Sequence, residues 1–179
     1  MDTTLPAVLE MARPPDTAQT ETAKQFLCLA IGDETYAIGI DIVREILEVG
    51  RMTPLPLTPP FVRGVMNLRG AVVPVIDMKA RFGHAPADIG RRSSVVILEA
   101  DHRGPDGPLV VGALVDGVSE VLEISEADID PVPALGTRIP REFLCGMAKS
   151  KGMLLCILDA DRILDRTAMA NLIAAHTPH

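Results

Sequence analysis

Aromatic residues are scarce in this chain of 179 residues, which contains no Trp, one Tyr and four Phe. Proteins that bind single-stranded nucleic acids stack the bases on aromatic side chains, and binding to the phosphate backbone depends on positive charge. This chain carries a formal net charge of -7 at pH 7. We therefore expect no nucleic-acid partner.

Long apolar runs are also lacking. No stretch reaches the ~20 consecutive apolar residues that a membrane-spanning helix needs. Residues 1–24 have neither the basic start nor the apolar centre of a signal peptide. They mix Pro, Thr, Ala and charged residues without a period, so we expect a flexible tail here and no direct insertion into a membrane.

Cysteine is rare as well. Cys28, Cys145 and Cys156 each lie in an apolar run, and none belongs to a C-x-x-C pair. This pattern is typical of buried thiols in a reducing compartment. The sequence therefore predicts a cytoplasmic protein.

The short motifs of common catalytic sites are missing. The sequence contains no P-loop, no G-x-S-x-G elbow, no H-E-x-x-H helix and no dinucleotide-binding G-x-G-x-x-G. The four His lie in Gly/Pro-rich loops or in the last residues, where a solvated side chain is the ordinary interpretation. We predict a protein that is not an enzyme and that holds no metal or cofactor.

Apolar runs separated by turn residues predict strands. Hairpins are expected around Gly32–Asp33, Arg69–Gly70 and Asp116–Gly117, because Gly tolerates the positive φ of a two-residue hairpin loop. From about Asp159 to Ala175, apolar residues recur at helical spacing and predict a C-terminal helix.

The most informative feature is an internal repeat. FVRGVMNLRGAVVPVID (residues 61–77) aligns with FLCGMAKSKGMLLCILD (residues 143–159) at a single offset of 82 residues. IDIVREIL (residues 40–47) aligns with VDGVSEVL (residues 115–122) at an offset of 75, and QFLCLAI with SVVILEA at an offset of 69. Insertions in surface loops account for the drift, so the chain contains two structurally equivalent halves.

These halves span about residues 25–90 and 91–160. Each holds several short strands in ~65 residues, which favours a small barrel because closure removes exposed sheet edges. The predicted fold class is therefore all-β, with two barrel halves and a C-terminal α-helix in one domain over residues 25–175. We expect the groove between the halves to bind a partner.

Three charged residues of the repeat are candidates for binding. Arg69 gains little structurally at a hairpin tip: either it is a solvated side chain, or its planar guanidinium forms forked hydrogen bonds with a partner. Glu45 and its repeat equivalent Glu120 lie in otherwise apolar strands, either facing solvent on an edge strand or awaiting a partner.

The remaining repeated polar and glycine positions have structural interpretations. Asp77 and Asp159 each end a predicted strand, where a carboxylate can cap the following turn. A small hydrolase or a ligand-binding barrel that uses Asp77, Asp159 or a histidine is the alternative from another class. Gly64, Gly70, Gly146 and Gly152 are interpreted as turn or bulge glycines.

Three blocks give the chain a family resemblance. FLCLAIGDETYAIGIDIVREIL, TPPFVRGVMNLRGAVVPVIDM, and VVGALVDGVSEVLEI followed by DIDPVP resemble the CheW family of chemotaxis coupling proteins over about Gln25 to Ala170. The resemblance implies two intertwined SH3-like five-stranded barrels. It also implies a non-catalytic scaffold that joins the cytoplasmic tip of chemoreceptors to the regulatory domain of a CheA-type histidine kinase, itself CheW-like.

The resemblance also assigns candidate residues. Receptor contact, or shaping of the receptor groove, is implied for Val43, Glu45, Arg69, Gly112 and Val118. Kinase contact is implied for Met52, Leu55 and Arg63. Arrays with other CheW-like domains are expected as well, and a coupling module of a non-flagellar pathway, with surface motility or a second messenger as output, is the alternative function.

Overall fold

The computed structural model describes residues 23–100, 109–132 and 141–164. Two sheets contain all the strands of this part of the chain. The first sheet has the order β3-β6-β7-β5-β4. Its strands are β3 (Val43–Glu48), β4 (Val62–Leu68), β5 (Ala71–Asp77), β6 (Ser94–Ala100) and β7 (Leu109–Val115).

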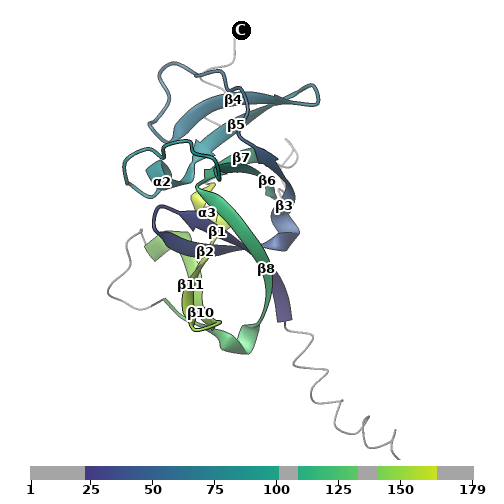
Figure 1. Cartoon of the computed structure of the whole chain (residues 1–179), viewed down its shortest axis with the longest axis vertical. Helices are drawn as coiled ribbons and strands as arrows, with labels where there is room; N and C mark the ends of the chain where they lie inside the picture. The colour runs from purple at the N-terminus through teal and green to yellow at the C-terminus, as the bar shows by residue number, and fades with distance from the viewer. Residues whose placement is uncertain (1–22, 101–108, 133–140, 165–179) are drawn as a thin grey trace, which may run out of the picture.

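The second sheet has the order β8-β1-β2-β11-β10-β9. Its strands are β1 (Ala23–Ile31), β2 (Glu34–Gly39), β8 (Gly117–Ser125), β9 (Ile129–Asp130), β10 (Leu144–Ser150) and β11 (Met153–Leu158). Single helical turns join the strands at η1 (Ile40–Ile42), α2 (Met78–Arg81), η2 (Glu126–Asp128) and η3 (Arg141–Phe143), and a further turn, α3 (Ala160–Ile163), follows β11. The two sheets lie one above the other in Figure 1.

Each sheet curls into a small barrel that the chain closes in the same way. After β3, Thr53 bridges Val65 on β4, and after β8, Asp130 of β9 pairs with Met147 on β10. Val65 and Met147 are repeat equivalents, separated by the offset of 82 residues. The predicted all-β fold with two five-stranded, SH3-like barrels is confirmed, with β9 as a two-residue closing strand.

The barrels do not follow the two halves of the sequence. β3, β4 and β5 come from the first half, but their barrel is completed by β6 and β7 from the second half. The other barrel joins β1 and β2 to β8, β10 and β11. The chain is therefore intertwined, and below we call the β3–β7 unit the first barrel and the other the second barrel.

The predicted hairpins had different outcomes. β1 pairs with β2 across Gly32–Asp33, and β4 pairs with β5 across Arg69–Gly70, as expected. The hairpin at Asp116–Gly117 was wrong, because β7 pairs with β6 and β5 while β8 pairs with β1. Pairing with distant strands outweighed the local turn signal. At Asp116 the chain passes from β7 in one barrel to β8 in the other, and at the repeat-equivalent turn η1 it passes from β2 to β3 in the same way.

The predicted C-terminal helix starts as expected and is described only in its first turn. The Asp159 carboxylate accepts a hydrogen bond from the Arg162 N–H at the start of α3, and Asp77 accepts one from the Ala80 N–H at the start of α2. Both predicted N-caps are confirmed. α3 ends at Ile163, and the remaining residues for which a helix was predicted, like residues 1–22 of the predicted tail, lie outside the described residues.

Gly64 and Gly146 lie at the points where the closing segments cross the barrels. The strand register shifts at both glycines, which confirms the predicted bulges. A Cβ atom on Gly64 would lie 2.4 Å from the Thr53 carbonyl oxygen, and one on Gly146 would lie 2.5 Å from Ile129 Cγ2. Closure of the barrels therefore requires glycine at both positions.

Three apolar clusters hold this architecture together. The interior of the first barrel is rich in Val, and that of the second includes Phe26, Cys28 and Ile157. The largest cluster lies between the barrels and takes residues from both, among them Leu29, Ile76 and Phe143. Apolar burial contributes roughly 25 cal/mol per Å², so this shared core fixes the barrels as one body.

Arg81 marks the junction of the barrels. Its guanidinium carbon lies 4.9 Å from the ring centroid of Phe61 and 4.6 Å from that of Phe143, two repeat-equivalent residues. Its Nε donates to the carbonyl of Ile163, 82 residues along the chain. Arg81 and Ile163 are thus repeat equivalents that contact each other directly at the junction of the barrels.

Candidate functional site

The structure brings two of the sequence-predicted residues, Glu45 and Arg69, into one ion pair. Glu45 lies on edge strand β3, and Arg69 lies at the tip of the β4–β5 hairpin. The guanidinium meets the carboxylate with both of its terminal nitrogens, the Nη1–Oε1 distance being 3.3 Å. The Arg69 side chain remains 68% exposed and that of Glu45 28%, so a partner can reach the pair.

The hairpin tip has the backbone of a tight turn. Arg69 has φ 51° and Gly70 φ 90°, the pattern of a type I′ turn, in which both central residues have positive φ. The Gly70 N–H donates to the Asn67 side chain over 3.0 Å. The turn therefore presents the arginine from a defined position.

The second barrel contains a copy of this arrangement. Lys151, with φ 53°, precedes Gly152 at the tip of the β10–β11 hairpin, and its Nζ lies 2.8 Å from Glu120 Oε1 on edge strand β8. Glu120 raises the pKa of Lys151 through this hydrogen bond and its charge. Both barrels thus carry a cation on a hairpin tip and a carboxylate on an edge strand.

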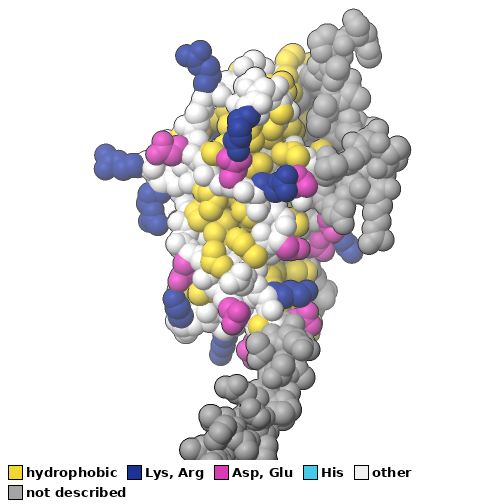
Figure 2. Space-filling view, turned by 90° about the vertical axis from the view of Figure 1, so that its right-hand side faces the viewer, with side chains coloured by type: hydrophobic (Ala, Val, Ile, Leu, Met, Phe, Trp, Pro, Cys, Tyr) yellow, Lys and Arg dark blue, Asp and Glu magenta, His cyan; other side chains and the backbone are white. Residues whose placement is uncertain are grey.

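Exposed apolar side chains follow the same repeat. Ile46 on β3 corresponds to Val121 on β8, and Val72 on β5 corresponds to Leu154 on β11. All four are exposed, as is Met153. Figure 2 views the side of the molecule that lies to the right in Figure 1, and hydrophobic side chains are exposed along its middle, with charged side chains around them. A mixed surface of this kind is typical of protein–protein contacts.

Val43 and Val118 are also repeat equivalents, 75 residues apart. Both are partly buried and pack against the core between the barrels. They lie at or near the start of the edge strands that carry Glu45 and Glu120. The structure thus places five of the candidate binding residues along β3, β8 and the first hairpin tip: Val43, Glu45, Val118, Glu120 and Arg69.

Gly112 lies inside the first barrel. A Cβ atom there would be 2.7 Å from Val95 Cγ1, so the interior leaves no space for a side chain. The structure brings Gly112 into the framework of the barrel and not onto the surface that holds Arg69.

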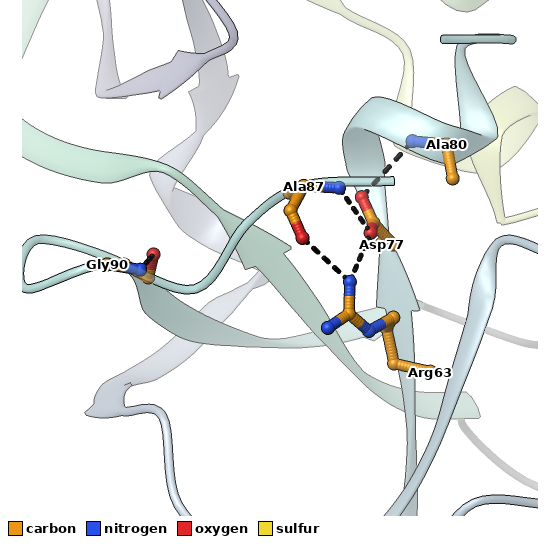
Figure 3. Close-up of polar contacts among 6 residues, drawn as sticks. Arg63, Asp77, Ala80, Ala87 and Gly90 are labelled. Carbon is orange, nitrogen blue, oxygen red and sulfur yellow. Dashed lines mark hydrogen bonds and ion pairs between the residues drawn. The ribbon is translucent and has the colours of Figure 1, made fainter. Parts of the chain in front are cut away.

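Two of the residues predicted for kinase contact face inward. Met52 packs against the interior cluster of the first barrel. Arg63 donates from Nη1 to Asp77 Oδ2 over 2.9 Å and to the Ala87 carbonyl over 2.8 Å, as Figure 3 shows. Leu55 is half-buried, and its carbonyl accepts a hydrogen bond from the Thr58 hydroxyl.

Asp77 is the centre of this internal network. Its side chain is fully buried and accepts from the Ala80 and Ala87 N–H groups over 3.1 and 2.9 Å, besides Arg63. A buried carboxylate that is bound in this way stabilises the fold. Asp77 therefore acts as a helix cap and ion-pair partner, in line with the structural interpretation of the sequence.

No group of three or more His, Cys, Asp or Glu among residues 23–100, 109–132 and 141–164 is arranged to hold a metal ion. Within the same ranges, no helix is long and apolar enough to cross a membrane.

Sequence reasoning selected Glu45 and Arg69 separately and missed their contact. The repeat contained a signal for this contact. The offset of 75 aligns Glu45 with Glu120, and the offset of 82 aligns Arg69 with Lys151, so both copies keep a carboxylate on a strand and a cation at a hairpin tip. Lys151 could have been found in the same way. Two barrels with exposed ion pairs beside apolar side chains define a protein-binding module.

Comparisons with known proteins show the family to which this module belongs. The family model of the CheW-like domain matches residues 25–168, so the chain belongs to that family. It is 34% identical over 144 residues to a "Chemotaxis protein CheW" from Rhizobium meliloti, covering 80% of this chain and 89% of the relative. It is 35% identical over 135 residues to "Protein FrzA" from Myxococcus xanthus, covering 75% of this chain and 80% of the relative.

A solved structure shows the same fold. The scaffolding protein TtCheW from Thermoanaerobacter tengcongensis superposes with a TM-score of 0.68 at 34% identity, covering 76% of this chain and 88% of that chain. The family and these relatives identify the chain as a coupling adaptor of the scaffold type in chemotaxis signalling.

Proposed function

We propose that the chain links the cytoplasmic tip of chemoreceptors to the regulatory domain of a CheA-type histidine kinase, without catalysing a reaction itself. The observation that carries this proposal is the exposed Glu45–Arg69 pair at the rim of the first barrel. Arg69 lies in the block GVMNLRGAVVPVID, where the resemblance to the CheW family is most specific, and Glu45 lies in the first matching block. The adaptor would act in the cytoplasm, at membrane-bound receptor clusters.

The receptor contact is assigned to the surface around Arg69. Val43 and Val118 lie over the core between the barrels, and the Glu45–Arg69 pair borders the first of them on β3. A helix with an apolar stripe gains about 25 cal/mol for each Å² that it buries, and charged contacts add specificity more than affinity. This surface therefore suits a helical receptor tip.

The kinase contact is assigned to the segment between β3 and β4, which contains Met52 and Leu55. Thr53 of this segment forms the closing bridge with Val65, and most residues from Thr53 to Pro60 are exposed. An adaptor that holds a receptor on one surface and a CheW-like domain on another extends arrays by multivalency, so each single contact needs only modest affinity.

A reconstitution with a full-length CheA-type kinase and a receptor fragment tests the proposal. The wild-type chain should raise kinase autophosphorylation, and Arg69→Ala should lose most of this effect by weakening receptor binding. Lys151→Ala is the matched control, because it removes the equivalent cation from the other barrel. The proposal fails if the wild-type chain binds neither partner at physiological salt, or if both variants behave alike.

A further inference from the structure

Leu57 is the most exposed large apolar residue among the described ranges, with 95% of its surface accessible. It also has φ 61°, a left-handed backbone conformation that L-residues with large side chains rarely adopt. Arg69 and Lys151 are the other described non-glycine residues with positive φ, and both lie in hairpin tips where their side chains make ion pairs. Leu57 has no such compensation within the fold.

The turn that presents Leu57 is held at both sides. Pro56 followed by a residue with positive φ is the pattern of a type II turn, in which Gly or Asn is usual at the second central position. The Thr58 hydroxyl donates to the Leu55 carbonyl over 3.0 Å. Before the turn, Thr53 exchanges two backbone hydrogen bonds of 2.8 Å with Val65, and after it the Val62 N–H donates to the Pro59 carbonyl.

A leucine in this position does not serve the stability of the chain. Its backbone conformation is unfavourable, and its exposed side chain gains nothing from burial. Strained residues persist mainly where they serve function. A large apolar side chain on a rigid turn is, moreover, a suitable anchor, because little conformational entropy is lost when a partner buries it.

The position of Leu57 on the first barrel indicates which partner contacts its side chain. The chain from Thr53 runs towards the start of β4, where Pro59 contacts Val62, whereas Arg69 follows the end of the same strand. A strand of this length spans about 20 Å, so Leu57 and Arg69 lie towards opposite ends of the first barrel. Leu57 belongs to the segment assigned to the kinase, in which Met52 is turned inward.

We propose that Leu57 is the apolar anchor of the kinase contact, inserted into an apolar pocket of the CheW-like regulatory domain of the kinase. This inference rests on the proposed function and deepens it. It replaces Met52 and Arg63, which the fold uses internally, with the exposed residue of the same surface.

The test uses Leu57→Asn and Leu57→Gly in the full chain, because both residues accept the left-handed conformation. Leu154→Asn is the matched control, since it removes an exposed leucine from the second barrel. Affinity for the full-length kinase and for a receptor fragment is measured by calorimetry, and the melting temperature by circular dichroism. Both Leu57 variants should bind the kinase at least about tenfold more weakly, with receptor affinity within about twofold of wild type and a melting temperature that is not lowered.

Each contrary result has a distinct meaning. Unchanged kinase affinity in both Leu57 variants overturns this inference alone. A lowered melting temperature with parallel loss of both partners shows that Leu57 is structural and also overturns it. Loss of self-association in sedimentation with intact kinase binding would assign Leu57 to a second copy of the chain. A wild-type chain that binds no kinase overturns the proposed function itself.

Discussion

The variant Arg63→Ala tests whether Arg63 is a structural residue or a partner contact, because the family resemblance assigned it to the kinase surface whereas the structure pairs it with the buried Asp77. The change removes two hydrogen bonds, to Asp77 and to the Ala87 carbonyl, and leaves a fully buried carboxylate without its cation. Breaking a buried pair costs ~3–5 kcal/mol when no compensation exists.

The cost here should lie below that range. Asp77 keeps the hydrogen bonds from Ala80 and Ala87, and the Arg63 side chain is 25% exposed, so water partly replaces it. We expect a loss of about 2–3 kcal/mol in the free energy of unfolding. For a chain of this size that corresponds to a melting temperature lower by about 5–10 °C.

Thermal and urea unfolding measure this loss, with Arg69→Ala as the control. The exposed Arg69 pair should contribute less than about 1 kcal/mol. Arg63→Lys should give an intermediate loss in the free energy of unfolding, because lysine keeps the positive charge but lacks the planar guanidinium with its several N–H donors. Equal melting temperatures for Arg63→Ala and Arg69→Ala, together with a kinase-binding defect in the former, would refute the structural role.

Two further predictions concern the barrel interiors and alkaline pH. Gly112→Ala forces a methyl group against Val95, so we expect a loss of about 1–3 kcal/mol in urea unfolding; a receptor-binding defect at unchanged stability would contradict this reasoning. Burial raises the pKa of the Cys28 and Cys156 thiols from 9.0, so the unfolded chain loses these protons first and stability falls as the pH rises above about 9. The urea midpoint should fall less steeply over this range in Cys28→Ala, and an equal slope would show that other groups cause the loss.

The repeat determined how much of the fold could be predicted. Hairpins, caps and bulges depend on residues close in sequence, so Arg69–Gly70, Asp77 and Gly64 had readable signals. The exchange of strands between barrels depends on pairings between distant segments, which no local pattern encodes. Asp116–Gly117 shows the difference, since a strong turn dipeptide became a crossing where β7 had better partners in one barrel and β8 in the other.

The sequence selected Glu45 and Arg69, which the structure brings together, but it also selected residues that the fold uses internally, such as Gly112 and Arg63. Sequence spacing cannot tell whether a charge points to solvent or to a buried partner, and so Arg63 was assigned to a partner contact although it pairs with the buried Asp77. Leu57 escaped notice because an isolated leucine among prolines has no distinctive pattern. Only its exposure and its positive φ distinguish it, and both are properties of the folded chain.

Exchanging the charges of Glu45 and Arg69 tests whether the receptor recognises each charge at its own position, or whether the ion pair only fixes the hairpin tip. Arg69→Glu alone places two carboxylates together at the rim, and because the site is exposed we expect the melting temperature to stay within about 3 °C of wild type. Receptor binding should be lost. The double variant Arg69→Glu with Glu45→Arg restores an ion pair of reversed polarity, so it should recover any lost stability without recovering receptor affinity. Recovery of affinity would instead show that the pair only holds the hairpin tip against β3, and that the receptor contacts the neighbouring apolar residues.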